Sequence, residues 1–419
     1  MRILVVGGGG REHAIVWKLS RSPLVDKIYC APGNGGIAEI AECLPVSAMD
    51  IVGMVSAAIK NKISLVVVTP DDPLAAGMVD EMEKAGIRAF GPSKIAAEIE
   101  SSKVFSKKLM KEYGIPTAGF ETFASSEKAM EYLENCDFPI VIKADGLALG
   151  KGVVIAGDLK EASQAVKEIM TDKTFGEAGN RIVIEEFLKG PEVSVLAFTD
   201  GSTVVPMVSS QDHKRAYDGD KGPNTGGMGA FSPSSHYTNE IARYCMTNIY
   251  KKTIDAMADI GRKFKGVIYF GLILTKEGPK VLEYNARFGD PETQAVLPRL
   301  KTDLAEIFEA VIDERLDEIE IKWSDEPVVC VVIASGGYPK KYQKGYEIHG
   351  IQDAGRDGDT VVFHAGTKSE NGRLVTSGGR VLGVASTGPD FRTALERAYE
   401  GVQKISFTDM YYRKDIGRK

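Results

Sequence analysis

Cysteine is scarce in this sequence and shows no pairing pattern. The 419 residues include five cysteines, at positions 30, 43, 136, 245 and 330. Their number is odd and no two of them form a C-x-x-C pair, which argues against a disulfide framework and against a zinc site built from cysteines. We therefore expect reduced thiols, as in a cytoplasmic protein.

Long apolar runs and an excess of basic residues are also missing. No uninterrupted apolar stretch approaches the ~20 residues that a membrane-spanning helix needs. The opening residues, MRILVVGGGG, lack the longer apolar region and the cleavage site of a secretion signal. The net charge of -6 gives no overall basic field for a polynucleotide. We expect a cytoplasmic location, with neither a membrane nor a polynucleotide as partner.

The composition that remains is typical of a large globular protein. Hydrophobic residues make up 43% of the chain and charged residues 26%. A chain of this length exceeds one ordinary hydrophobic core, so we expect two to four packed units.

Residues 1–92 alternate short apolar runs with helical stretches; the runs are RILVVG, KIYCAP, LVVVTP and RAFGP. Apolar strands separated by helices are typical of a doubly wound parallel sheet, whose ligand crevice lies at the carboxyl ends of the strands. Those ends carry GGGGRE, APGNGG and TPDDPLAAG, where backbone N–H groups can approach an anion. A small phosphorylated metabolite fits this edge, although plain strand-to-helix turns would also give such loops.

A dinucleotide cofactor fits the first loop poorly. Glu12 stands where the third glycine of the G-x-G-x-x-G fingerprint belongs, and no acidic residue ends the second strand in YCAPGN. A nicotinamide or flavin oxidoreductase is therefore disfavoured.

The middle of the chain predicts a helix over residues 93–113, then a hairpin over 138–157 whose loop, DGLALGKG, can close over a ligand. Lys143 lies inside the first hairpin strand, where an unpaired ammonium would be costly. It faces either a bound anion or a structural carboxylate such as Glu185. The pair Lys107 and Lys108 is interpreted as a solvated helix face.

Residues 210–233 read as a long polar loop, and such loops in compact domains are usually functional or disordered. Asp212 and Lys214 flank His213, which is either a proton carrier or an ordinary loop histidine. Residues from about 326 onward predict a small mixed domain.

The segment VLEYNARFGDPETQ, residues 281–294, holds the densest chemistry. Glu283, Asn285 and Arg287 would share one strand face and so combine two hard oxygen ligands with a guanidinium. This suits a magnesium ion beside an anion, whereas the alternative is a solvated strand face. Asp290 and Glu292 either cap the following helix or act as ligands.

These segments occur together, in this order, in one known family. GGGGREHA, PGNGG, KADGLALGKGV, QDHKRAYDGDKGPNTGGMGAFSP and EYNARFGDPETQ resemble the successive signatures of the glycinamide ribonucleotide synthetases, which belong to the ATP-grasp superfamily. The resemblance spans essentially the full chain. It implies an α/β fold, α+β in the ATP-binding part: an N-terminal doubly wound parallel sheet, an ATP-grasp module of two subdomains and a small C-terminal mixed domain.

The resemblance implies four units. They are a phosphoribosylamine-binding domain over 1–102, a small ATP-grasp subdomain with a glycine-rich lid over 103–192, a central subdomain with the metal and glycine site over 193–325, and a C-terminal domain over 326–419.

The implied reaction joins glycine to 5-phosphoribosylamine, with ATP becoming ADP and phosphate through a glycyl phosphate, in de novo purine synthesis. It implies ATP with Mg²⁺ or Mn²⁺, small-molecule substrates, and a monomer or small homo-oligomer.

The resemblance also assigns residues by group. Glu283 and Asn285 would hold the metal, and Arg287, Asp212 and Lys143 would be catalytic. The nucleotide would be held by Lys103, Lys143, Gly150, Gly152, Glu185, Glu186, Leu188 and Glu192. The other substrates would be held by Gly9, Arg11, Glu12, Gly33, Asn34, Pro73, Asp212, Lys214, Gly227 and Arg287.

Two departures from the family pattern stand out. The strand GVIYFGLILT carries no acidic metal ligand, and the third N-terminal loop reads TPDDPL where Gly-Pro-Glu is expected. Two other functions remain open: another ATP-grasp ligase or carboxylating enzyme acting on a different phosphoribosyl intermediate, and a nucleotide-binding regulatory protein without turnover. The intact set Glu283, Asn285, Arg287 and Lys143 argues against the second.

Overall fold

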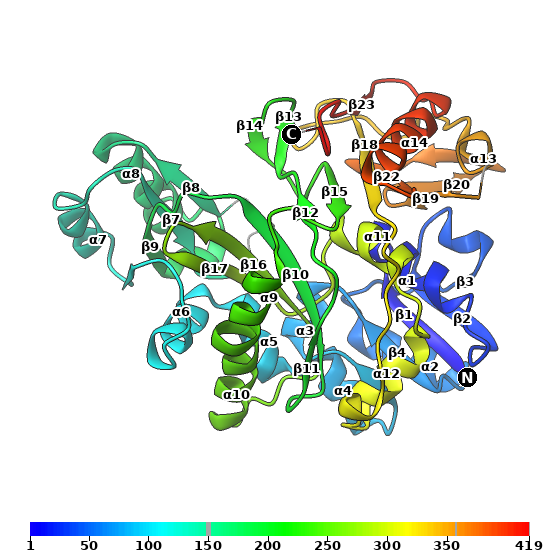
Figure 1. The fold of residues 1–419 in the computed structure, drawn as a ribbon, viewed down its shortest axis with the longest axis horizontal. Coiled ribbons are helices and arrows are strands. Elements are labelled where there is room, and N and C mark those ends of the chain that lie inside the picture. The colour runs from blue at the N-terminus through cyan, green and yellow to red at the C-terminus, as the bar shows by residue number, and fades with distance from the viewer. Residues whose placement is uncertain (148–151, 357, 419) are drawn as a thin grey trace.

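A computed structural model describes residues 1–147, 152–356 and 358–418 of the chain. Figure 1 shows a small antiparallel sheet with its helices at one end of the molecule and the C-terminal sheet near the other. A central sheet lies between them, and the N-terminal sheet packs below the C-terminal one in this view. This arrangement confirms the predicted fold class.

The N-terminal sheet is parallel throughout, in the order β3-β2-β1-β4-β5. Its apolar strands bury both faces: Leu4 and Val6 belong to one core cluster, Ile3 and Val5 to another. From β1 the strand order runs to one edge through β2 and β3 and to the other edge through β4 and β5, so the loops after β1 and β4 border a crevice. The elements are β1 Arg2–Gly7, α1 Gly10–Leu19, β2 Lys27–Pro32, β3 Glu42–Cys43, α2 Ile51–Lys60, β4 Leu65–Val68, α3 Asp71–Ala76, α4 Met78–Lys84 and β5 Arg88–Phe90.

The connection to the next unit consists of two helices, not the single predicted one. Helix α5 spans Lys94–Ser101 and α6 spans Lys103–Glu112. Ser102 separates them in an extended conformation, and its hydroxyl accepts a hydrogen bond from the Phe105 N–H at 3.1 Å. The break follows because serine caps a new helix start.

The small subdomain is a four-stranded antiparallel sheet in the order β6-β9-β7-β8, covered on one face by α7 and α8. Ile142 and Ile184 face these helices in the core. Side chains alternate along a strand, so Lys143 and Glu185 project from the opposite face. The elements are β6 Phe120–Phe123, α7 Ser126–Leu133, β7 Ile140–Ala144, β8 Val153–Ala156, α8 Leu159–Val166 and β9 Ile182–Glu186.

The central sheet runs β11-β10-β16-β17 and is antiparallel. Its register shifts between Gly271 and Leu272 of β16, where Glu283 pairs with Gly271 and Val281 with Leu272. Leu282 is therefore the extra residue of a β-bulge. The elements are β10 Glu192–Thr199, β11 Val204–Pro206, α9 Asn239–Cys245, α10 Lys251–Asp259, β16 Gly266–Thr275, β17 Gly278–Asn285, α11 Glu292–Val296 and α12 Leu304–Ile312.

The segment 210–233 contains short strands, so its prediction as a loop is wrong in part. Two of these strands extend the C-terminal sheet, whose order is β12-β15-β18-β22-β19, and β23 also pairs with β18. The buried residues Met228 and Ala230 hold this segment against the molecule. The elements are β12 Gln211–Asp212, β13 Arg215–Tyr217, β14 Lys221–Asn224, β15 Gly229–Ser232, β18 Val328–Ser335, α13 Ile351–Ala354, β19 Thr360–His364, β20 Thr367–Glu370, β21 Arg373–Thr376, β22 Arg380–Thr387, α14 Phe391–Lys404 and β23 Met410–Tyr412.

Among the described residues, no helix has both the length and the apolar character needed to cross a membrane.

Two buried histidines join helix α1 of the N-terminal unit to strand β19 of the C-terminal sheet. The His364 backbone N–H donates to His13 Nδ1 at 2.7 Å. Burial lowers the pKa of His13 to about 3 and that of His364 to about 4. The unfolded chain protonates both near pH ~6.5, so it binds more protons than the folded chain below that pH. Their contribution to stability is full above about pH 6.5 and is lost as the pH falls toward 4.

We predict that His13→Asn, which keeps an acceptor for the His364 N–H, reduces the loss of stability on acidification. The expected reduction is about 2 kcal/mol between neutral pH and about pH 5. It would appear as a smaller fall in the thermal unfolding midpoint than in wild type. His236→Asn, at an exposed position, serves as the matched control and should leave the fall unchanged. An equal fall in His13→Asn and wild type would contradict this prediction.

Candidate active site

The bulge at Leu282 decides which side chains of β17 face the site. Val281 and Tyr284 both belong to the core, although a regular strand would place residues three apart on opposite faces. The extra residue reverses the alternation, so Glu283 and Asn285 leave the core face. The predicted metal ligands are thus brought to one face by a local irregularity.

Three lysines surround Glu283. Lys214 Nζ lies 3.4 Å from Glu283 Oε1. Lys214, and then Lys143 and Lys103, lower the pKa of Glu283 to about 2. The group is therefore a carboxylate at any physiological pH, in surroundings that favour negative charge.

The donor set fits a hard divalent cation held mainly by a substrate. Glu283 and Asn285 offer a carboxylate and an amide oxygen. In the described part of the chain, no group of three or more His, Cys, Asp or Glu residues forms a metal cage. Mg²⁺ commonly binds through one or two protein oxygens together with phosphate oxygens and water. The residues present fit that pattern.

Lys143 pairs with the buried carboxylate of Glu185, as one of the two predicted alternatives states. Its Nζ lies 3.0 Å from Glu185 Oε1 and donates to the Leu282 carbonyl at 3.0 Å. Lys107 approaches Glu185 Oε2 at 2.9 Å and has only 2% of its surface exposed. The prediction that Lys107 is solvated is wrong, because α6 turns it toward Glu185; Lys108 is exposed as predicted.

The other predicted nucleotide residues in the described part of the chain lie at the start of helix α6 and at or near the ends of strands of the small and central sheets. Lys103 Nζ donates to the Gly146 carbonyl at 2.9 Å, and burial lowers its pKa. Glu186, at the end of β9, accepts from the Gly119 N–H at 2.9 Å. The remaining positions are Leu188, half-buried after β9; Glu192, exposed and 3.4 Å from Lys214; Gly152, buried just before β8; and Gly150, which lies outside the described residues.

Arg287 lies just beyond β17 and is held by a residue that the sequence did not reveal. Its Nη2 is 3.1 Å from Oε1 of the buried Glu100, on α5. Glu100 Oε2 also accepts from the Ala286 N–H at 2.7 Å. Burial alone would lower the pKa of Arg287, but nearby acidic groups, Glu100 above all, raise it above its usual value. Arg287 Nε is buried without a hydrogen-bond partner, which leaves one strong donor for a ligand.

The first N-terminal loop reaches this region. Glu12 accepts from the Gly9 N–H at 2.6 Å and from Arg11 Nε at 2.6 Å. Arg11 in turn donates to the Phe288 carbonyl at 3.1 Å. The predicted substrate residues of the first loop therefore contact the segment that follows Arg287.

Residues of the second and third N-terminal loops make hydrogen bonds and packing contacts with other parts of the protein. Asn34 Nδ2 donates to the carbonyls of Gly8 and His364 at 3.0 and 2.7 Å, and the Gly33 N–H donates to Gly7. Pro73 is buried in the first turn of α3. The side chains of Asn34 and Pro73 thus have structural contacts at this edge.

Asp212 and Lys214 flank the end of β12, beside β17. Burial raises the pKa of Asp212 to about 7, and nearby acids that include Glu292 add to the rise while Lys214 opposes it. His213 is buried and packs at 5.9 Å from the Phe231 ring. Gly227 has φ +114°, and a Cβ there would lie 2.3 Å from Pro291 Cδ, so a side chain cannot fit.

Glu292 lies in the first turn of α11, where an acid favours the helix N-terminus, as the capping alternative states. It also accepts from Ser194 at 3.4 Å, and Asp290 pairs with Arg380 at 3.2 Å. Arg380, another residue that the sequence did not single out, ties the C-terminal sheet to the site.

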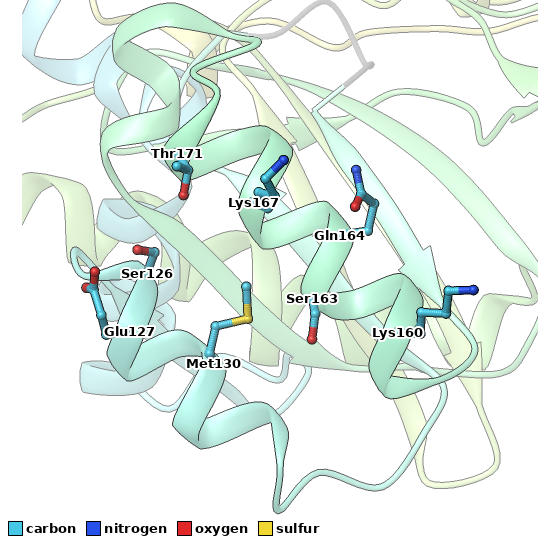
Figure 2. A pocket seen from close by; sticks show the side chains of 8 residues that line it. All are labelled: Ser126, Glu127, Met130, Lys160, Ser163, Gln164, Lys167 and Thr171. Atoms are coloured by element: carbon cyan, nitrogen blue, oxygen red, sulfur yellow. The ribbon is translucent and has the colours of Figure 1, made fainter.

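A groove elsewhere on the small subdomain is separate from these residues. Figure 2 shows that it lies between α7 and the α8 region, with the side chain of Met130 between the two helices. Its lining residues are Ser126, Glu127, Met130, Lys160, Ser163, Gln164, Lys167 and Thr171. None of them belongs to the predicted site, because these helices cover the opposite face of the small sheet.

Comparisons with known proteins give consistent results along the chain. The N domain, ATP-grasp domain and C domain models of phosphoribosylglycinamide synthetase match residues 1–100, 101–293 and 328–419. A phosphoribosylamine–glycine ligase from Caldanaerobacter subterraneus is 49% identical over 416 residues, covering 99% of each chain. The trifunctional purine biosynthetic protein adenosine-3 of Gallus gallus is 49% identical over 420 residues, covering 99% of this chain and 42% of that protein.

Solved structures agree with the sequence comparisons. The crystal structure of a phosphoribosylamine–glycine ligase from Thermotoga maritima matches with a TM-score of 0.86 and 33% identity, covering 99% of this chain and 100% of that chain. The resemblance that the motifs indicate is confirmed, and this chain belongs to the phosphoribosylglycinamide synthetase family.

Proposed function

We propose that this chain ligates glycine to 5-phosphoribosylamine, giving glycinamide ribonucleotide, ADP and phosphate, as an enzyme of purine biosynthesis. Its family membership supports the reaction. The observation that carries the site assignment is the placement of Glu283 beside Lys103, Lys143 and Lys214, on the strand face that also carries Asn285. Two oxygen ligands next to three ammonium groups suit a metal-bound polyphosphate.

The chemistry begins with activation of glycine. A carboxylate is a poor acyl donor because its leaving group would be oxide. A glycine carboxylate oxygen attacks the terminal phosphorus of ATP, the bond to the bridging oxygen breaks, and ADP leaves. The glycyl phosphate is then attacked by the amine of phosphoribosylamine. The new carbon–nitrogen bond forms as phosphate departs and the amine gives up a proton.

The protein's contribution to this sequence is positioning and charge neutralisation. Lys103 and Lys143 contact the ATP phosphates, and the backbone around Glu186 and Leu188 binds the adenine. Glu192 binds the ribose. Gly150 and Gly152, in the glycine-rich loop of the small subdomain, are assigned to nucleotide binding by the family resemblance.

Mg²⁺ or Mn²⁺, held by Glu283 and Asn285, would neutralise phosphate charge. Arg287 directs its open Nε donor toward the glycine carboxylate and the charge that develops during transfer. Its fork is already oriented by Glu100, so little rotamer freedom is lost on binding.

The remaining substrate groups lie around this centre. Asp212 binds the glycine ammonium, with Lys214 and Gly227 beside it. The loops of Gly9 to Glu12, Gly33 to Asn34 and Pro73 receive phosphoribosylamine at the switch point of the parallel sheet.

We also propose that the chain divides at residues 102, 192 and 325 and acts in the cytoplasm as a monomer or small homo-oligomer.

The reaction is tested by omission of each substrate in turn. ADP release from magnesium ATP should require both glycine and freshly generated phosphoribosylamine, and glycinamide ribonucleotide should appear in equal amount by mass spectrometry. ADP release with another acid or amine, and none with this pair, would contradict the substrate assignment.

We predict that Glu283→Gln lowers kcat by at least about 100-fold, because the amide removes the charge that a metal ligand supplies. Its thermal unfolding midpoint should stay close to that of wild type. Glu277→Gln, at the exposed turn of the same hairpin, is the matched control and should retain full activity. Near-normal turnover in Glu283→Gln would exclude the metal assignment.

A pH dependence follows from Asp212. With a pKa near 7 it is neutral below that pH and anionic above it, so it binds the glycine ammonium only at the higher pH. We predict that kcat/KM for glycine falls about tenfold per pH unit below 7. In Asp212→Asn, kcat/KM for glycine should be low at every pH, and its fall below pH 7 should disappear. A fall that persists unchanged in Asp212→Asn would show that another group titrates.

A further inference from the structure

A fully buried lysine, Lys107, lies behind the site and pairs with Glu185, one of the residues assigned to the nucleotide. Lys107 Nζ lies 2.9 Å from Glu185 Oε2 and donates to Thr117 Oγ1 at 2.7 Å. Glu185 pairs with Lys143 on its other side. We call Lys107, Thr117, Glu185 and Lys143 the buried lysine network. Lys107, Lys143 and Glu185 are all buried. Burying three charged groups is costly, so a plain structural purpose would be served as well by apolar residues.

The network ends on the β-bulge at two points. Thr117 Oγ1 donates to the Val281 carbonyl at 2.7 Å, and Lys143 Nζ donates to the Leu282 carbonyl at 3.0 Å. The backbone adds a third tie, since the Val281 N–H donates to the Pro116 carbonyl at 2.8 Å. The two carbonyls that bracket the extra residue are therefore both held by side chains of the network.

We propose that Lys107 is a positioning residue for the metal ligands, acting through Thr117 and Glu185 on the bulge of β17. A bulge leaves ladder groups without strand partners, so it needs other partners to persist. Without the extra residue, Glu283 would turn to the core face beside Val281, because a one-residue shift moves a side chain to the other face of a sheet. This inference rests on the proposed metal role of Glu283 and Asn285.

A second effect follows from charge. Glu185 is 3% exposed and carries two lysine partners. When Lys143 turns toward the ATP phosphates, Lys107 keeps the Glu185 carboxylate paired. The free-energy cost of separating Lys143 from Glu185 is therefore smaller. Removal of Lys107 would leave Glu185 with Lys143 alone and bind that ammonium more firmly away from the nucleotide.

The test compares Lys107→Met with Lys108→Met, its exposed neighbour on the same helix. Binding of Mn²⁺ in the presence of a non-hydrolysable ATP analogue is measured by electron paramagnetic resonance, which requires no turnover. We predict that Lys107→Met raises the Kd for Mn²⁺ by about 10-fold or more, the size usual for groups that orient metal ligands. Lys108→Met should stay within about twofold of wild type by the same standard.

A second pair of variants covers the case in which Lys107→Met fails to fold. Thr117→Val removes the hydroxyl at constant shape, whereas Thr117→Ser keeps it. Thr117→Val should raise the Kd for Mn²⁺, as Lys107→Met does. Thr117→Ser should bind Mn²⁺ about as well as wild type. Unchanged Mn²⁺ affinity in Thr117→Val, or in a folded Lys107→Met with a lowered unfolding midpoint, would show that the network is structural and overturn the proposal.

Glu283→Gln separates this inference from the function on which it rests. If Glu283→Gln binds Mn²⁺ as well as wild type, the proposed metal site is wrong. If Glu283→Gln loses the ion while Lys107→Met and Thr117→Val keep it, the metal site stands and the positioning role of Lys107 is wrong.

Discussion

The extra residue at Leu282 is the constraint on which the site depends. It lets one strand put Val281 and Tyr284 into the core and still direct Glu283 and Asn285 to the other face. The bulge is held from the small subdomain through Lys143, which thus touches both the site and the strand that carries the predicted metal ligands. Two sheets from different subdomains are thereby fixed relative to each other where the phosphates are proposed to bind.

The N-terminal and C-terminal units both contact the candidate active site through buried charged residues. From the N-terminal side, Glu100 orients Arg287. From the C-terminal sheet, Arg380 pairs with Asp290 and donates to the Gly226 and Asp290 carbonyls at 2.7 Å each. Because each charge is paired, the guanidinium groups keep defined orientations without substrate. Such preorganisation suits phosphoryl transfer, in which the protein supplies geometry and charge more than covalent chemistry.

The sequence revealed the regular elements and the ordered motifs, because both depend on local pattern. The apolar runs around Val5 and Val67 predicted the parallel sheet, and the motif around Glu283 predicted the strand of the metal ligands. Long-range pairing was not visible. The partner of Lys107 is 78 positions away and that of Arg287 is in another unit, so Lys107 read as solvated and Glu100 was missed. The bulge too depends on pairing with β16, which β17 alone does not specify.

The most direct measurement is the position of the metal. A crystal structure of the chain with Mn²⁺ and a non-hydrolysable ATP analogue would locate the ion by its anomalous scattering. We predict a peak coordinated by Glu283, Asn285 and phosphate oxygens, with the bulge at Leu282 retained. An ion coordinated by phosphates and other residues, with Glu283 facing away from it, would contradict the account.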